Sequence, residues 1–346
     1  MSAVSKLTWL AGVAAVAITA PATSFAAAAA ADSPSVQELV VTADKREENV
    51  KDVPQSVTAI SGASLDIQRA VSFQDYVTQV PGMNLVSSQP GSARLTLRGI
   101  NAGGDSATIG TYVDETPYGS VTGLANGAVL APDLDTFDMK RLEVLRGPQG
   151  TLYGASSLGG LLKFVMNAPD PSHFEARGEI DGEGLNSGGD GGSVKALVNI
   201  PLTSTAAFRA SGYYSEQPGY IDDPLRGAKD VNSARYDGAR FGFLYKPMDN
   251  FSIRLSAVGQ DISSRGSNTE DLNPTTLQTL YGDLTQSRTF SSPNVLQYRI
   301  YNATITYDFG AANLTSATSY GKLHQTTNED ATAQLGALLS SVFKTN

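Results

Sequence analysis

Metal and nucleophilic chemistry depends mainly on histidine, cysteine and paired serine or acidic side chains, and this chain offers few of them at useful spacing. Its two histidines, His173 and His324, lie far apart in the sequence, and neither has a second histidine nearby. The absence of cysteine excludes a disulfide framework and a thiolate metal site. No serine, histidine and aspartate form a hydrolase motif. The sequence therefore predicts no metal site, no resident cofactor and no enzymatic activity.

A glycine-rich segment at residues 147–160 invites comparison with a phosphate-binding loop. Such a loop needs a Gly-Lys-Ser/Thr step that opens a helix. No lysine occurs between Arg146 and Lys163, so this comparison fails. We expect the glycines to turn the chain between strands instead. The net charge of -9 also argues against a nucleic-acid partner.

Arg98 and Arg146 each follow a β-prone run and precede a glycine. A guanidinium shielded from water needs carboxylate or carbonyl partners, since an unpaired buried charge costs about 3 to 5 kcal/mol. Buried arginines at these positions would therefore require partners, whereas arginines on solvated loops would not. The residues themselves leave both possibilities open.

Residues 38–43 form a short β-prone island, which consists of Glu38, Leu39, Val40, Val41, Thr42 and Ala43. Charged and polar residues follow directly, from Asp44 to Asp52, so we expect the island not to pair with its own neighbours. A lone extended segment near a terminus is suited to pairing with an edge strand of another protein. The alternative is an ordinary first strand of the next domain.

The N-terminus has the three regions of a secretory signal. Lys6 precedes an apolar run from Leu10 to Ala20, and Ser24 and Ala26 are the small residues of a cleavage site. The run is too short for a membrane-spanning helix, which needs roughly 20 residues. We predict a signal peptide at residues 1–26 and a flexible segment at residues 27–52 that carries the island.

Residues 53–170 have the pattern of an α+β domain. Helical pieces at residues 63–71 and 73–79 alternate with β-prone runs, and glycine and proline mark the boundaries. The expected strands are residues 56–60, 94–97, 109–113, 142–145 and 161–165.

In residues 171–346 apolar side chains recur at every second position, which is typical of strands with one polar face. We predict seven antiparallel strands, at residues 174–182, 194–200, 208–214, 239–245, 251–257, 301–309 and 314–320. Such alternation is compatible with a soluble sandwich. Two details favour a transmembrane barrel. One face of the first strand is charged along its whole length, from Glu175 to Glu183, and short connections alternate with long ones.

Four motifs in order resemble those of TonB-dependent outer-membrane receptors. The island LVVTA resembles the TonB box of that family, and residues 95–99 (LTLRG) and 112–117 (YVDETP) match two motifs of its plug domain. Residues 137–169 (FDMKRLEVLRGPQGTLYGASSLGGLLKFVMNAP) are closely similar to the plug signature. The chain departs from the family at two points. Gly154 is followed by Ala155 where the family often has an Arg-Asn pair, and Asp114 is followed by Glu115 where glycine is commoner. The resemblance implies a plug at residues 53–170 and outer-membrane barrel strands at residues 171–346.

Receptors of this family import a scarce extracellular ligand, typically a ferric siderophore, across the outer membrane. The resemblance implies that TonB adds a strand to residues 38–43 and pulls, after the plug has signalled that ligand is bound. It also implies that Arg98 and Arg146 pair with glutamates on the inner barrel wall. No motif identifies the ligand itself.

Length is the main physical objection to this interpretation. Plugged transporters have about 22 strands, and an open barrel would leave backbone groups unpaired in lipid. We therefore expect an incomplete barrel, with the glutamates that would meet the two arginines beyond this chain. Three hypotheses stay open: part of an active transporter whose other strands are encoded elsewhere, a truncated product without transport, or a periplasmic module in which the plug alone binds ligand or TonB.

Overall fold

The computed structural model describes residues 40–43, 45–46, 48–70, 72–100, 106–119, 133–332 and 335. By its backbone contacts the chain forms two units, residues 1–37 and 38–346, and all described residues belong to the second. The predicted signal peptide and residues 27–39, which include Glu38 and Leu39, lie outside the described residues. None of the helices described is long and apolar enough to cross a membrane.

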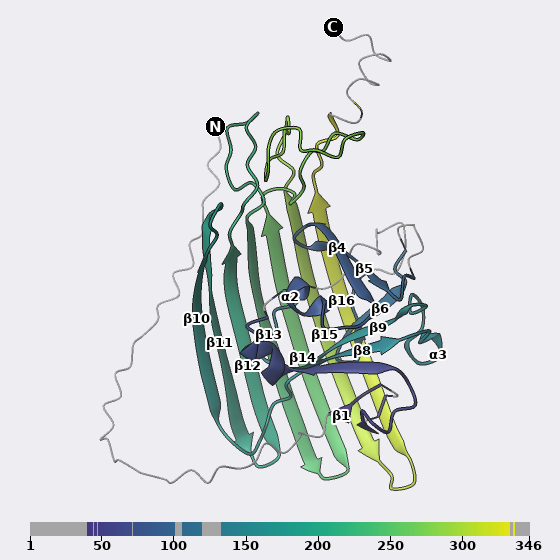
Figure 1. Cartoon of the computed structure of the whole chain (residues 1–346). Coiled ribbons are helices and arrows are strands. Elements are labelled where there is room, and N and C mark those ends of the chain that lie inside the picture. Colours follow the sequence, from purple (N-terminus) through teal and green to yellow (C-terminus); the bar gives the residue numbers. More distant parts are fainter. Residues whose placement is uncertain are drawn as a thin grey trace, which may run out of the picture. The chain divides into compact units, whose positions relative to one another are not determined.

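A mixed five-stranded sheet in the order β3-β8-β9-β6-β7 forms the centre of residues 48–170, which we call the plug (Figure 1). Strands β6 and β9 run parallel, and the other neighbours run antiparallel. The strands of this sheet are β3 (Val57–Ser61), β6 (Ile109–Val113), β7 (Thr116–Pro117), β8 (Met139–Arg146) and β9 (Gly160–Met166). The other elements before residue 171 are β1 (Val40–Val41), which precedes the plug, and β2 (Glu48–Asn49), β4 (Met83–Gln89), β5 (Ser92–Leu97), α1 (Gly62–Ile67), α2 (Phe73–Val77) and α3 (Gly150–Tyr153) within it.

Local sequence explains where the first two helices begin. The Ser61 side chain accepts a hydrogen bond from the backbone of Ser64 and caps α1, and Ser72 and Asp75 form a capping box at α2. Every residue of β9 is buried, and the core of the plug is built from apolar side chains of β8, β9 and α2. The predicted α+β domain is therefore observed, with β4, β7 and α3 as additional elements.

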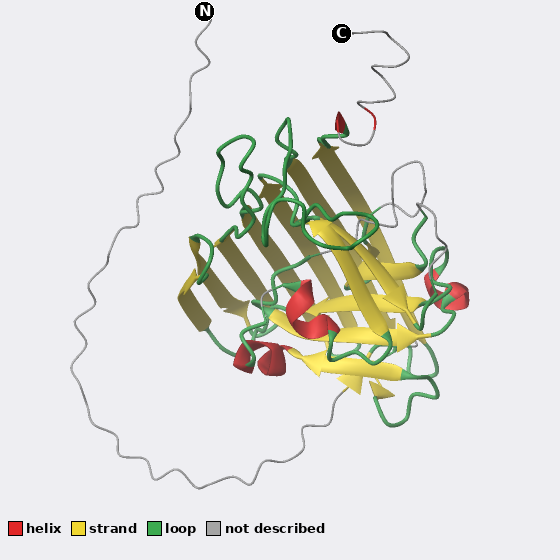
Figure 2. Cartoon of the chain, turned by 45° about the horizontal axis from the view of Figure 1, so that its top comes forward, coloured by secondary structure: helices red, strands yellow, loops and turns green. Residues whose placement is uncertain are grey.

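Seven antiparallel strands in sequence order form a second sheet, which we call the wall (Figures 1 and 2). The structure has a strand at each of the seven positions predicted from the alternating pattern. Its edge strands β10 and β16 do not pair with each other among the described residues, so the sheet is open. The strands are β10 (Glu175–Gly184), β11 (Asp190–Thr203), β12 (Ala206–Gln217), β13 (Ala234–Met248), β14 (Phe251–Ser264), β15 (Asn294–Asp308) and β16 (Asn313–Thr327).

The wall has a polar inner face and an apolar outer face. In β11, Lys195 and Asn199 are buried against the plug, whereas Val194 and Ile200 are exposed on the other side. Sheets of water-soluble proteins have the opposite arrangement, with apolar side chains toward the core. Polar-in and apolar-out alternation is the pattern of a transmembrane barrel wall.

Candidate functional site

The described part of the island, residues 40–43, folds back on the plug as a hairpin. Strand β1 pairs antiparallel with β2, with Val40 opposite Asn49 and Val41 opposite Glu48. The expectation that the island would not pair with its own neighbours was therefore wrong. The chain reverses because Lys45 adopts a left-handed φ of 61° and donates its backbone N–H to the Thr42 carbonyl at 3.2 Å.

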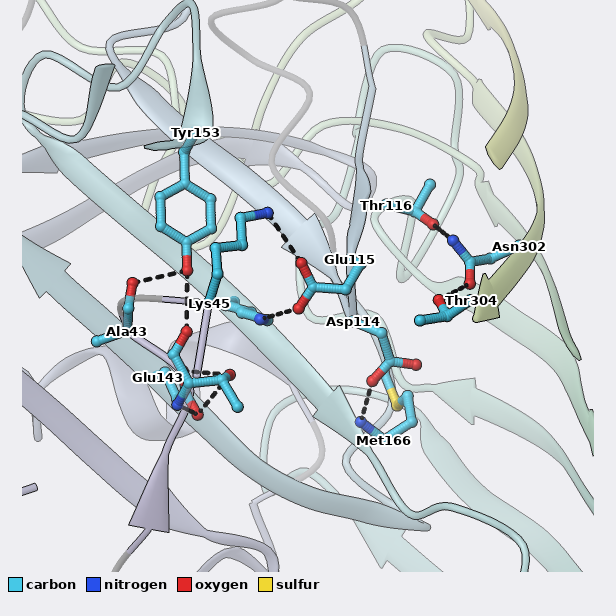
Figure 3. A network of polar contacts seen from close by, with 12 residues as sticks. Ala43, Lys45, Asp114, Glu115, Thr116, Glu143, Tyr153, Met166, Asn302 and Thr304 are labelled. Atoms are coloured by element: carbon cyan, nitrogen blue, oxygen red, sulfur yellow. Dashed lines mark hydrogen bonds and ion pairs between the residues drawn. The ribbon is translucent and has the colours of Figure 1, made fainter. Parts of the chain in front are cut away.

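The described island residues are bound to the plug by burial and by hydrogen bonds. Val41 and Ala43 are fully buried, in a cluster that includes Tyr153. The Tyr153 hydroxyl lies 3.0 Å from the Thr42 carbonyl oxygen and 2.9 Å from that of Ala43, so it can donate to either one (Figure 3). The Thr42 backbone N–H donates to Glu143 Oε1 at 2.9 Å. Two plug side chains that lie far away in the sequence thus hold the docked segment.

Glu143 is shared between the island and a buried arginine. Its side chain is fully buried, and its Oε1 accepts from Arg141 Nε at 2.7 Å. Arg141 itself is 2% exposed, and its Nη2 has no hydrogen-bond partner among the described residues. A buried guanidinium depends on its carboxylate partner, so the ion pair with Arg141 fixes the position of the Glu143 carboxylate. The same carboxylate then accepts the hydrogen bond from Thr42.

Lys45, two residues after the island, is held by one carboxylate and two aromatic rings. Its Nζ lies 2.8 Å from Glu115 Oε2, 4.4 Å from the centre of the Tyr153 ring and 5.4 Å from that of Tyr112 (Figure 3). Lys163 binds the other oxygen of the same carboxylate at 2.5 Å. Burial acts to raise the pKa of Glu115, but the two ammonium groups outweigh it and lower that pKa below its usual value of 4.5.

We expect docking of residues 40–43 to weaken in acid. A carboxyl group with a lowered pKa in the folded state contributes stability above its unfolded pKa, and loses it as pH falls through the folded pKa. Susceptibility of the hairpin to pepsin, normalised to an unfolded substrate, should therefore rise as pH falls below 4.5. In Glu115→Gln the susceptibility should be high throughout and nearly independent of pH. A wild-type response identical to that of Glu115→Gln would contradict this assignment.

Cations of the wall hold a plug segment at residues 133–138, which directly precedes β8. Lys195 of β11 lies 2.8 Å from Asp135, and Arg209 Nε of β12 lies 2.7 Å from Asp138. Arg240 of β13 donates to the Phe137 carbonyl oxygen at 2.6 Å. Three consecutive wall strands thus each contribute one buried cation to the same short segment.

A fourth wall cation contacts the turn between β6 and β7. Arg254 of β14 lies 2.7 Å from Asp114, whose other oxygen accepts from the Met166 backbone at 3.0 Å. The adjacent Thr116 accepts a hydrogen bond at 3.0 Å from Asn302 of β15. The turn is therefore bound to two wall strands.

Asp133 begins the wall-bound segment and is half-buried where plug and wall meet. Its carboxylate accepts from the Phe73 backbone at 2.9 Å and from the Tyr236 hydroxyl at 3.1 Å. Burial raises the pKa of Asp133, and these two hydrogen bonds oppose the shift without cancelling it.

Arg98 lies close to Gly147, the residue that follows Arg146. Arg98 is exposed, and its Nη1 lies 3.7 Å from the position that a Cβ atom on Gly147 would occupy. Within the described residues neither arginine forms an ion pair, and the Nε atom of Arg146 is buried without a hydrogen-bond partner. Their pairing with barrel glutamates stays a prediction. The charge pairs that the structure does contain between plug and wall have cations on the wall and carboxylates on the plug.

Sequence reasoning located the island but missed the side chains that hold it. Glu143 and Tyr153 are about as far from Thr42 in the sequence as the domain allows, so no local spacing indicates the contact. A usable signal existed for the wall contacts. Strands β11, β12 and β14 each carry a single arginine or lysine, β13 carries Arg240 among its three basic residues, and the plug segment repeats aspartate at positions 133, 135 and 138.

The histidines take no part in this network. His173 Nδ1 lies 3.1 Å from Asp170 at an exposed position, and His324 lies within β16 rather than after it. In the described part of the chain no group of three or more histidine, aspartate or glutamate side chains is arranged to hold a metal ion.

Residues 49–161 match the family model of the TonB-dependent receptor plug domain. The chain therefore contains a TonB-dependent receptor plug domain. The hemin receptor of Yersinia pestis is 33% identical over 138 residues, which are 39% of this chain and 19% of that receptor. The pesticin receptor of Yersinia pestis is 32% identical over 205 residues, which are 57% of this chain and 28% of that receptor.

The crystal structure of the ferric yersiniabactin uptake receptor from Yersinia pestis shares the fold, with a TM-score of 0.62 at 19% identity. The match covers 79% of this chain and 41% of that receptor. The predicted fold class, an α+β plug followed by antiparallel strands that do not close into a barrel within the described residues, is confirmed. The chain spans less than a third of the length of the two curated relatives described above.

Proposed function

We propose that this TonB-dependent receptor chain takes part in TonB-energised uptake of a scarce ligand across the outer membrane, with residues 38–43 as the TonB box. The observation that carries this proposal is the docked but short strand β1. Within the described residues, its two residues pair only with the two residues of β2. A two-stranded hairpin is marginally stable by itself, so a TonB strand with a longer pairing edge can replace β2.

The proposed location in the outer membrane is supported by the exposed side of the wall. Large apolar side chains face outward on successive strands, and polar or charged side chains face the plug. Examples of the exposed residues are Ile180, Val194, Phe241, Leu255 and Tyr301. Such a surface is stable in hydrocarbon and costly in water.

We propose that ligand binds where the plug hairpin β4–β5 meets the long connection between β14 and β15. A cavity of about 800 Å³ lies there, lined by Ser88 and Gln89 of the plug and by residues of that connection. Its described lining carries four carboxylates and one guanidinium, from Glu270, Asp271, Glu329, Asp330 and Arg288.

The excess of carboxylates favours a neutral or cationic ferric chelate over an anionic one, because like charges repel in a partly desolvated site. Binding of a cationic ferric hydroxamate and of an anionic ferric catecholate to outer membranes that contain the chain compares the two directly. Tighter binding of the catecholate would contradict the proposed ligand charge and leave the TonB-box assignment intact.

Val40→Pro should abolish TonB binding. Proline removes the backbone N–H and fixes φ, so residue 40 can no longer take part fully in a strand ladder. The expected loss is at least about tenfold in affinity, equivalent to about 1.4 kcal/mol. The measurement is binding of the purified periplasmic domain of TonB to outer membranes that contain the full chain.

Val40→Ala is the matched control, because it shortens the same side chain and keeps the backbone donor. It should bind TonB nearly as well as the wild type, since backbone pairing tolerates varied side chains. Equal binding by Val40→Pro and Val40→Ala would show that residues 38–43 are not the TonB box.

A further inference from the structure

Two adjacent carboxylates in the turn between β6 and β7 contact different parts of the protein. Asp114 contacts Arg254 of the wall. Glu115 contacts Lys45, the lysine that follows the island, as Figure 3 shows. Because they are neighbours in one tight turn, a displacement of one must move the other. The turn is thus placed to connect the wall with the docked segment.

On the island side, Glu115 and two tyrosines surround the Lys45 ammonium. The carboxylate lies 2.8 Å from Nζ, and the Tyr153 ring lies under the same group. Tyr153 also contacts the carbonyl oxygens of Thr42 and Ala43 through its hydroxyl. Lys45 has a positive φ that a non-glycine residue adopts at some cost. Contacts of its side chain therefore help to hold the backbone that closes the hairpin.

On the wall side, Asp114 is fixed at several points. Its carboxylate binds Arg254 of β14 and the Met166 backbone, and its own N–H donates to the Phe164 carbonyl at 2.8 Å. Its φ of 51° is again left-handed. Arg254 is the one contact of Asp114 in this set that comes from outside the plug. Together with the Asn302–Thr116 hydrogen bond it sets the turn's position relative to the wall.

We propose that the Asp114–Glu115 turn is a latch that couples the wall to the docked island. Arg254 positions Asp114, and Glu115 in turn retains Lys45. A shift of the plug against β14 moves the turn, withdraws the Glu115 carboxylate from Lys45 and releases residues 40–43. This inference rests on the proposed function only in taking the released segment to be the TonB box.

The chain's lack of cysteine makes the latch directly measurable. Val41→Cys places a single thiol in a side chain that is fully buried in the docked hairpin. The rate at which a maleimide labels this thiol, in outer membranes that contain the full chain, reports how often the hairpin opens. Resistance of the plug to trypsin, measured in parallel, shows that each variant is folded.

The island arm of the latch is tested with Glu115→Gln and Lys45→Met in this background. Each should raise the labelling rate by about tenfold, as expected for the loss of a charge-assisted hydrogen bond. The double variant should label no faster than the faster single variant, because both remove the same contact. Lys51→Met is the control, since Lys51 is exposed and its side chain forms no ion pair within the described residues. Labelling unchanged by Glu115→Gln would overturn the latch.

The wall arm is tested with Arg254→Met, which should also raise the labelling rate at position 41 and be non-additive with Glu115→Gln. Arg254→Lys, which keeps the positive charge, should restore most of the slow labelling. Arg299→Met is the matched control, because Arg299 pairs with Asp261 within the wall at 2.7 Å. Unchanged labelling in Arg254→Met would refute the coupling. TonB binding is measured separately, so loss of the TonB-box assignment would not be confused with failure of the latch.

Discussion

Replacing Gly62 by alanine is expected to prevent the plug from reaching its folded state. A Cβ atom at this position would lie 1.9 Å from the Met139 carbonyl oxygen and 3.3 Å from that of Lys140. Both oxygens belong to the backbone of β8, so no side-chain rotation can relieve the contact. Since β8 lies in the middle of the plug sheet, its displacement would disturb β3 and β9 as well. Overpacking that requires backbone shifts costs about 3 kcal/mol or more.

Gly150→Ala is the matched control for this substitution. No atom lies within 4 Å of its Cβ position, and alanine favours the helical conformation of α3. Thermal unfolding and trypsin resistance of the full chain should show a wild-type plug in Gly150→Ala and an unfolded one in Gly62→Ala. A Gly62→Ala plug as resistant as the control would mean that α1 does not pack so closely against β8.

Glu143→Leu is expected to destabilise the plug strongly and to free the docked island. Removing the carboxylate leaves the Arg141 guanidinium buried without a counter-charge, which costs about 3 to 5 kcal/mol. It also removes the acceptor for the Thr42 backbone and hydroxyl. The variant should therefore combine a lower thermal midpoint with rapid labelling of a cysteine at position 41.

The double variant Arg141→Met/Glu143→Leu separates these two effects. Replacing a buried ion pair by apolar side chains of similar size is often close to neutral for stability, so the thermal midpoint should largely recover. The Thr42 acceptor would still be missing, so the island should remain easily labelled. Slow labelling in the double variant would show that Glu143 does not hold the island.

The strands were predictable because the chemical signal is periodic and local. In β11 and β15 every second residue faces the plug, and the alternation is visible in the sequence. The helix α3 was missed because four residues give no period. Strand β4 was missed because its pattern, MNLVSSQ, contains few strongly β-prone residues.

The docking of the island was mispredicted for a different reason. The charged residues after Ala43 indicated a break in the sheet, but charge does not prevent a turn when a side chain such as Lys45 is neutralised. The carboxylate that neutralises Lys45 belongs to Glu115, which lies 70 residues further along the chain. The same limit applies to Glu143, because hydrogen bonds between distant segments leave no spacing to detect.

The sequence by itself determined the plug domain, its α+β class and the positions of the seven wall strands, and it predicts that residues 38–43 pair with TonB. These follow from ordered motifs and from periodicity, which are local properties of a chain. Only the tertiary structure decided that residues 40–43 fold into a hairpin, that Glu143, Tyr153 and Glu115 hold it, and that wall cations pair with plug aspartates. Partners of buried charges are chosen by distance in three dimensions, and that distance is fixed only once both sheets have packed against each other.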